Sequence, residues 1–99
     1  MNAADVLRES AAVIEQRAAL RDKPDGERSM ARAVAAFNAL TGRQLTELEG
    51  WLFMCALKMS RATAGATHVD DWVDLAGYSA LAAESVAPVV IAPKKRGGR

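Results

Sequence analysis

The sequence is poor in the residues that disulfides, zinc sites and common catalytic centres require. Its 99 residues include one cysteine, Cys55, and one histidine, His68. A single cysteine excludes an intrachain disulfide, and one cysteine with one histidine excludes a zinc site of familiar spacing. Nucleophilic triads and the glycine-rich fingerprints of nucleotide-binding folds are also absent. The enzymatic chemistry that remains open is metal-assisted phosphate chemistry through carboxylates.

Long apolar runs are missing as well. No stretch approaches the roughly 18 consecutive apolar residues that a membrane-spanning helix needs. Asp5 and Glu9 near the N-terminus do not fit a secretory signal. We therefore expect no membrane partner and a cytoplasmic location.

Basic residues are too few in the expected folded part to favour nucleic-acid binding. Four of the 13 lysines and arginines follow residue 93, which leaves nine against 12 acidic residues and a net charge of −3 for residues 1–93. A nucleic-acid-binding surface is usually basic, so we do not expect nucleic acid as a partner. We expect the basic end, PKKRGGR, to be a solvated, disordered tail that adds at most loose electrostatic affinity.

Alanine, in contrast to these residues, is abundant in the chain. Hydrophobic residues make up 51% of the chain, and alanine dominates them. Alanine favours helix but removes little area from water, and a domain of this length buries only about 60–65% of its unfolded surface. We therefore expect an all-α, four-helix bundle-like domain over residues 1–87 that forms a homo-oligomer. Residues 88–99 would be a C-terminal strap and the basic tail.

Apolar periodicity and turn residues predict where the first two helices lie. The first covers residues 3–21, with two apolar rows that repeat every seven residues. Residues 22–26 (DKPDG) interrupt the helix because proline and Asp-Gly favour a turn. The second helix covers residues 27–40, and Gly42 follows its last turn as a helix-ending glycine does.

The third and fourth helices form the hairpin around which the chain is organised. Thr46 and Glu49 fit a capping box, which predicts the start of the third helix. This helix is apolar on three sides, so we expect it to be buried in a bundle or against another subunit. Residues 62–67 form the turn, with Gly65 as the expected cap, and the fourth helix covers residues 69–86.

Two basic residues stand at the end of the third helix. Lys58 and Arg61 lie one turn apart, on the same stripe as Trp51 and Met54. Cations suit the C-terminal end of the helix dipole, which is one explanation of their presence. They can also bind a phosphate through charge-assisted hydrogen bonds. In that interpretation Trp51 belongs to the same ligand site.

Acidic residues stand opposite them, at the start of the fourth helix. Asp71, Asp74 and Tyr78 share one face, and the two aspartates lie one turn apart. Acidic residues suit the N-terminal end of a helix, so capping is one explanation. Carboxylates in this arrangement can also hold Mg²⁺, which prefers hard oxygen ligands and keeps several waters. Asp71 and Asp74 are therefore candidate magnesium ligands, with Tyr78 beside them in the ligand site.

A second basic pair opens the second helix. Arg28 and Arg32 lie one turn apart and follow the charged loop at residues 22–26. Such a pair near a helix start can clamp an anion, with the loop contacting a phosphate. The alternative is a solvated face that follows a plain connector.

Two stretches carry a family resemblance. DKPDGERSMARAVAAFNALTG and TELEGWLFMCALKMSRA, the latter followed by HVDDWVDLAGYSALAAE, resemble a family of small phage and prophage proteins of unknown function. The likeness is strongest in the K-x-x-R of Lys58 and Arg61, the following D-x-x-D, and A-G-Y at residues 76–78. This resemblance implies a bacterial host cell as the location.

That family in turn looks like a reduced version of the MazG-like all-α nucleotide pyrophosphohydrolases. Those enzymes are oligomeric helical bundles that hold magnesium on an E-E-x-x-E and an E-x-x-D motif and cleave nucleoside triphosphates to monophosphates. Here Asp71-x-x-Asp74 matches the second motif loosely, and the first is absent. Glu49 lies about 180° around its helix from Lys58, so the two cannot serve one compact site in a subunit. The reduced carboxylate set favours binding over hydrolysis.

Three functions follow as hypotheses. The first is a phage-type oligomer that captures a nucleotide or a nucleotide-derived signal, with a counter-defence role. The second is a Mg²⁺-dependent MazG-like pyrophosphohydrolase that uses Asp71 and Asp74. The third is a helical regulator that binds a host protein through a surface formed by Trp51 and Met54. The eight candidate ligand-binding residues are Arg28, Arg32, Trp51, Lys58, Arg61, Asp71, Asp74 and Tyr78.

Overall fold

The protein is helical throughout residues 1–21 and 29–87, the part that the computed structural model describes. The helices are α1 (Ala3–Arg21), α2 (Ser29–Thr41), α3 (Glu47–Ala62) and α4 (Val69–Val86), and no strand occurs within those residues. The all-α prediction is therefore confirmed. The predictions for Arg28, the charged loop, the strap and the basic tail fall outside the described residues.

The helices begin and end close to where the sequence signals place them. Thr46 and Glu49 form the expected capping box, in which Glu49 N–H donates to Thr46 Oγ1 over 3.1 Å and Thr46 N–H donates to Glu49 Oε1 over 2.9 Å. Gly42 follows α2 with a φ of 77°, a conformation that glycine adopts without strain. The prediction for Gly65 was wrong, because Thr63 is the C-cap of α3 and Gly65, at φ 86°, lies within the turn.

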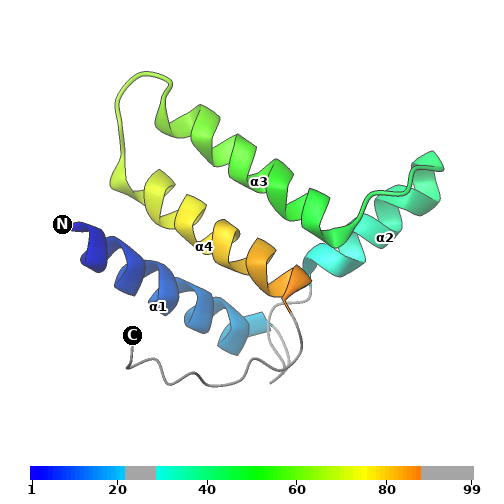
Figure 1. The fold of residues 1–99 in the computed structure, drawn as a ribbon, viewed down its shortest axis with the longest axis horizontal. Helices are drawn as coiled ribbons and strands as arrows, with labels where there is room; N and C mark the ends of the chain where they lie inside the picture. The colour runs from blue at the N-terminus through cyan, green and yellow to red at the C-terminus, as the bar shows by residue number, and fades with distance from the viewer. Residues whose placement is uncertain (22–28, 88–99) are drawn as a thin grey trace.

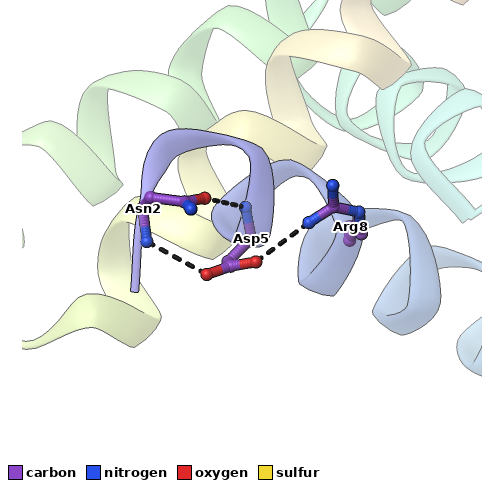
Figure 2. Close-up of polar contacts among 3 residues, drawn as sticks. All are labelled: Asn2, Asp5 and Arg8. Carbon is purple, nitrogen blue, oxygen red and sulfur yellow. Dashed lines mark hydrogen bonds and ion pairs between the residues drawn. The ribbon is translucent and has the colours of Figure 1, made fainter.

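A second reciprocal cap begins α1 (Figure 2). Asp5 N–H donates to Asn2 Oδ1 over 2.9 Å, and Asn2 N–H donates to Asp5 Oδ2 over 3.1 Å. The other oxygen of Asp5 accepts a hydrogen bond from Arg8 over 2.9 Å. The spacing N-x-x-D is a variant of the capping box, so the sequence contained this signal for the start of α1.

Three of the helices form one layer, and the fourth projects from its end (Figure 1). α4 lies in the middle, with α3 antiparallel to it on one side and α1 on the other. α2 packs against α3 alone among the described helices. The arrangement is therefore more open than the expected four-helix bundle, because α2 does not close the bundle over α1 and α4.

Two glycines let the outer helices approach the central hairpin. A Cβ at Gly77 of α4 would lie 3.0 Å from Ser10 Oγ of α1. A Cβ at Gly50 of α3 would lie 2.9 Å from Val34 Cγ2 of α2 and would clash with the Met30 sulfur. Both contacts are close helix crossings that a larger residue would push apart.

The connection between α2 and α3 is fixed by a side-chain amide. Asn38 donates from Nδ2 to the Leu45 carbonyl over 2.9 Å, and its Oδ1 accepts from Leu45 N–H over 3.0 Å. These two bonds mimic a pair of backbone hydrogen bonds. Together with the contact at Gly50, they set the direction in which α2 projects.

The buried apolar core of one subunit is small. Its members come mainly from α3 and α4 and are Val34, Trp51, Cys55, Ala62, Val73 and Ala82. In the heptad rows of α1, Leu7 and Leu20 are exposed, and α4 is the one described helix against which α1 packs.

The close approach at Gly77 makes a specific stability prediction. We expect Gly77→Leu to destabilise the protein by about 1–2 kcal/mol, because overpacking costs about 1–3 kcal/mol and the better helix propensity of leucine offsets part of it. Urea unfolding measures this. The matched control is Ala80→Leu at an exposed position of the same helix, with an expected change within about 0.5 kcal/mol. Equal effects of the two substitutions would contradict the crossing at Gly77.

The capping box of α3 gives a second prediction. Thr46→Ala removes the acceptor for the Glu49 N–H and should cost about 0.5–2 kcal/mol of unfolding free energy. Thr67→Ala, at an exposed threonine of the α3–α4 turn, serves as the control and should change stability little. A Thr46→Ala protein with unchanged thermal stability would show that the cap is not needed.

Candidate functional site

The site is built on an ion cluster that joins α3 to α4. Lys58 Nζ lies 2.8 Å from Asp74 Oδ2 and 3.9 Å from Asp71 Oδ1. The side chains of Lys58, Asp71 and Asp74 are 11%, 16% and 21% exposed. The opposite charges that the sequence placed across the hairpin therefore meet, in a setting that is largely shielded from water.

Pairing between the opposite charges offsets most of the cost of this burial, and the helix dipoles contribute in the same direction. Lys58 lies in the C-terminal half of α3, and both aspartates lie in the first two turns of α4. Each charge thus has the sign that its helix dipole favours. The short Lys58–Asp74 contact is a charge-assisted hydrogen bond, which is stronger than a neutral one. With two carboxylates and one ammonium, the cluster carries a net charge of −1.

An aromatic pair lies along the same helix interface. The rings of Trp51 and Tyr78 stack with centroids 5.8 Å apart and an interplanar angle of 30°. Trp51 Nε1–H donates to Glu47 Oε2 over 3.2 Å, so its one polar atom is satisfied. The indole is 4% exposed, which buries it within the subunit. Trp51 is therefore the support behind Tyr78, and Tyr78 is the partly exposed member of the pair.

This burial corrects the role of Trp51 in the third hypothesis, whereas Met54 is half-buried. A regulator that binds a host protein through Trp51 needs that side chain at the surface, and it is not there. The stripe that contains Trp51 and Lys58 is one of the sides of α3 that were expected to be buried. α4 covers this side, as the Lys58 ion pairs and the Trp51–Tyr78 stack show.

Arg17 of α1 is a site residue that the sequence did not reveal. It lines a cavity of about 30 Å³ together with Asp74 and Tyr78, between α1 and α4. A volume of that size holds a water molecule and not a larger ligand. The signal that could have identified Arg17 is its position one turn after Val13 and Ile14, which line the same cavity.

Two other basic candidates, Arg61 and Arg32, take no part in the ion pairs of the cluster. Arg61 is exposed one turn beyond Lys58, and no ion pair involves it within the described residues. Arg32 is exposed on α2, which packs against α3 around Gly50. Gly50 precedes Lys58 by eight residues, roughly 12 Å along the helix. The structure therefore groups five of the eight predicted residues: Trp51, Lys58, Asp71, Asp74 and Tyr78.

The carboxylates at the site form a pair rather than a full metal-binding set. Within residues 1–21 and 29–87, no group of three or more histidine, cysteine, aspartate or glutamate residues could hold a metal ion. Glu49, the nearest counterpart of the missing acidic motif, is engaged in the α3 cap. Two carboxylates suit Mg²⁺ only when waters or ligand oxygens supply the remaining positions.

The single cysteine lies in a helix interface, and the single histidine lies at the start of a helix. Cys55 is buried, and its sulfur lies 3.8 Å from Ser79 Oγ across the α3–α4 interface. His68 is the exposed N-cap residue of α4 and makes no side-chain capping bond.

No described helix is long and apolar enough to cross a membrane.

Comparison with known protein families shows which family the chain belongs to. Residues 5–86, which contain all of the site, match the profile of the DUF6378 family, described as a domain of unknown function. The chain belongs to this family. The matched region begins in the first turn of α1 and ends with α4, so it coincides with the helical domain. No curated protein and no solved structure matches the chain significantly.

The different surroundings of Lys58 and Arg61 make a third prediction. Lys58→Met leaves two shielded carboxylates without their cation and should cost about 1–3 kcal/mol, less than for a fully buried pair because water reaches the cluster. Arg61→Ala should change the unfolding free energy by at most about 0.5 kcal/mol. Chemical denaturation of both variants measures this difference. Equal, small effects would show that the Lys58 cluster contributes no more than a surface ion pair.

Proposed function

We propose that the protein captures a nucleotide or a nucleotide-derived small molecule at the Lys58–Asp71–Asp74 cluster. The observation that carries the proposal is a shielded ammonium held between two carboxylates that remain 16% and 21% exposed. Such a cluster combines a group that binds phosphate with a pair of oxygen donors for a cation. A complex of a nucleotide with Mg²⁺ presents both complementary charges.

The charge balance argues for capture together with the metal ion. The cluster alone has a net charge of −1, so a bare phosphate gains little from it. Binding of Mg²⁺ by Asp71 and Asp74 would reverse that sign and release the Lys58 ammonium for a phosphate oxygen. In this proposal the ion supplies positive charge, and the protein residues supply position and a shielded setting in which charge interactions are stronger.

Arg17 and Tyr78 supply the next contacts in the proposal. Both line the small cavity beside Asp74, from the two helices that flank it. An arginine adds a planar group for phosphate, and the accessible part of Tyr78 offers a surface for a base or sugar. Because the cavity holds only about 30 Å³, the remainder of the ligand would lie over the outer edge of the cluster.

We place this activity in the cytoplasm of a bacterial host cell, as part of an oligomer of the phage-type family that the sequence resembles. Capture of a signal nucleotide there would weaken a defence that depends on it. The cluster has two carboxylates, because Glu49 does not join it. This small number supports binding of a nucleotide more than its hydrolysis.

Capture is tested by incubating the protein with nucleoside mono-, di- and triphosphates, with and without Mg²⁺, and analysing released small molecules by mass spectrometry. We expect recovery of unaltered ligand that depends on Mg²⁺. Arg17→Ala should weaken the affinity about tenfold to a hundredfold, since losing one charge-assisted bond costs about 1.5–3 kcal/mol. Arg8→Ala on the same helix, whose side chain is 73% exposed and pairs with Asp5, should leave affinity unchanged.

Hydrolysis is the second candidate, because Asp71 and Asp74 face the same cation position. If the protein is a pyrophosphohydrolase, it will release pyrophosphate from nucleoside triphosphates with Mg²⁺, and Asp74→Asn will abolish the release. Asp70→Asn is the matched control, since Asp70 is exposed in the same turn. Absence of both ligand recovery and pyrophosphate release would overturn the two candidates together.

A further inference from the structure

Several large apolar side chains of α3 are uncovered in one subunit. α4 covers one side of this helix, and α2 covers only its beginning. On the remaining surface, Phe53 is 71% exposed, Leu52 51% and Met59 50%. Monomeric proteins rarely expose a contiguous apolar patch larger than a few hundred Å². A helix of this composition at the edge of a layer therefore indicates a further packing partner.

A groove continues this surface toward α2. It has a volume of about 500 Å³ and lies between α2 and the first turns of α3. Its lining is apolar except for one carboxylate, and the residues used here are Met30, Phe37, Leu45, Glu49, Phe53 and Met54. Glu49 already accepts hydrogen bonds from Thr46 within its cap, so its carboxylate stays hydrogen-bonded when the groove is covered.

Specific contacts on both sides fix the shape of the groove. The two Asn38–Leu45 hydrogen bonds fix the chain between α2 and α3 on one side. The close crossing at Gly50 fixes the helices on the other. A rigid apolar concavity of this kind presents the same shape to every partner, which suits specific docking.

We propose that a second copy of this chain covers the α3 face and the α2–α3 groove, forming a symmetric dimer. A symmetric interface requires one surface to complement itself, with both a projection and a recess. Here Phe53 projects from the rim of the groove that it lines, so each subunit offers both elements. The proposal rests on this surface alone and does not depend on nucleotide capture.

The exposed apolar side chains supply most of the area that a stable dimer needs. Five side chains contribute: Phe53, Leu52 and Met59, with Phe37 at 44% and Leu45 at 38% exposed. At roughly 200 Å² for a fully exposed large apolar side chain, they supply roughly 500 Å² per subunit. Two copies thus contribute roughly 1,000 Å² from these side chains, and the other residues of the groove have to supply the remainder of the about 1,200 Å² at which stable interfaces begin.

The small core identifies the partner as another copy. Among the described residues, no large side chain is less than 2% exposed, so one subunit lacks a well-sealed centre. A helical domain with so small a core gains stability when it buries further apolar surface, and association with another subunit is one way to do so. A second copy is present whenever the protein is made, whereas a different partner or a small molecule is not.

Substitution of Phe53 tests the interface. In multi-angle light scattering across micromolar concentrations, we expect the wild-type protein to have twice the mass of one chain. Phe53→Lys should halve that mass, because the lysine would be buried without a partner. The matched control is Leu7→Lys at an exposed position of α1, a helix that contacts only α4, and it should remain dimeric.

Thermal unfolding at several concentrations keeps the test decisive if Phe53→Lys fails to fold. The Tm of the wild-type protein should rise with protein concentration, as it does when folding is linked to association. Loss of the folded state in Phe53→Lys, with Leu7→Lys unaffected, also supports the proposal. A monomeric wild type with a concentration-independent Tm overturns it, and so does a Phe53→Lys protein that stays dimeric. A monomer whose Tm rises only with an added fatty acid would assign the groove to a small ligand instead.

Discussion

The packing of α3 against α4 is the contact on which the other parts of the structure depend. A buried interface with three kinds of contact holds the two helices: the Lys58–Asp74 ion pair, the Trp51–Tyr78 stack and the Cys55–Ser79 contact. α1 attaches to this hairpin through α4, and α2 attaches through α3. Neither outer helix contacts the other within the described residues, so each derives its position from the hairpin alone.

This arrangement explains why glycine and small residues appear at the helix crossings. Each outer helix has one neighbour among the described helices and gains stability by approaching it closely. Gly77 permits this for α1 and Gly50 permits it for α2. The same arrangement leaves the far side of α3 uncovered, because α3 lies at the edge of the layer and α2 meets only its beginning (Figure 1). Close crossings inside the subunit and an apolar face outside it are two consequences of the same open topology.

The ion cluster joins α3 to α4, and the same shielding from water also makes its charged groups candidates for binding a ligand. Shielding from water strengthens the attraction between Lys58 and its two carboxylates, and it equally strengthens their interaction with any ligand that replaces one partner. A cluster fully sealed in the core would serve structure only. The proposed capture depends on the partial exposure of Asp71 and Asp74 and on Arg17, which lines the small cavity beside Asp74. Because the family has no described function, this cluster is the feature within the matched region that offers testable chemistry.

The amino-acid sequence by itself determined the local structure of this protein. Capping residues such as Thr46 and Glu49, the glycine after α2 and the apolar periodicity identified the helices, because these signals act between residues that are near in sequence. The pairing of Lys58 with Asp71 and Asp74 was also predictable, since a short turn constrains two helices to lie side by side. The sequence could not show that α2 stays outside the bundle, that the Trp51 side of α3 is the one that faces α4, or that Arg17 lines the cavity beside Asp74. Those outcomes depend on which helix faces pack together, and only the tertiary structure decides among faces of similar apolar character.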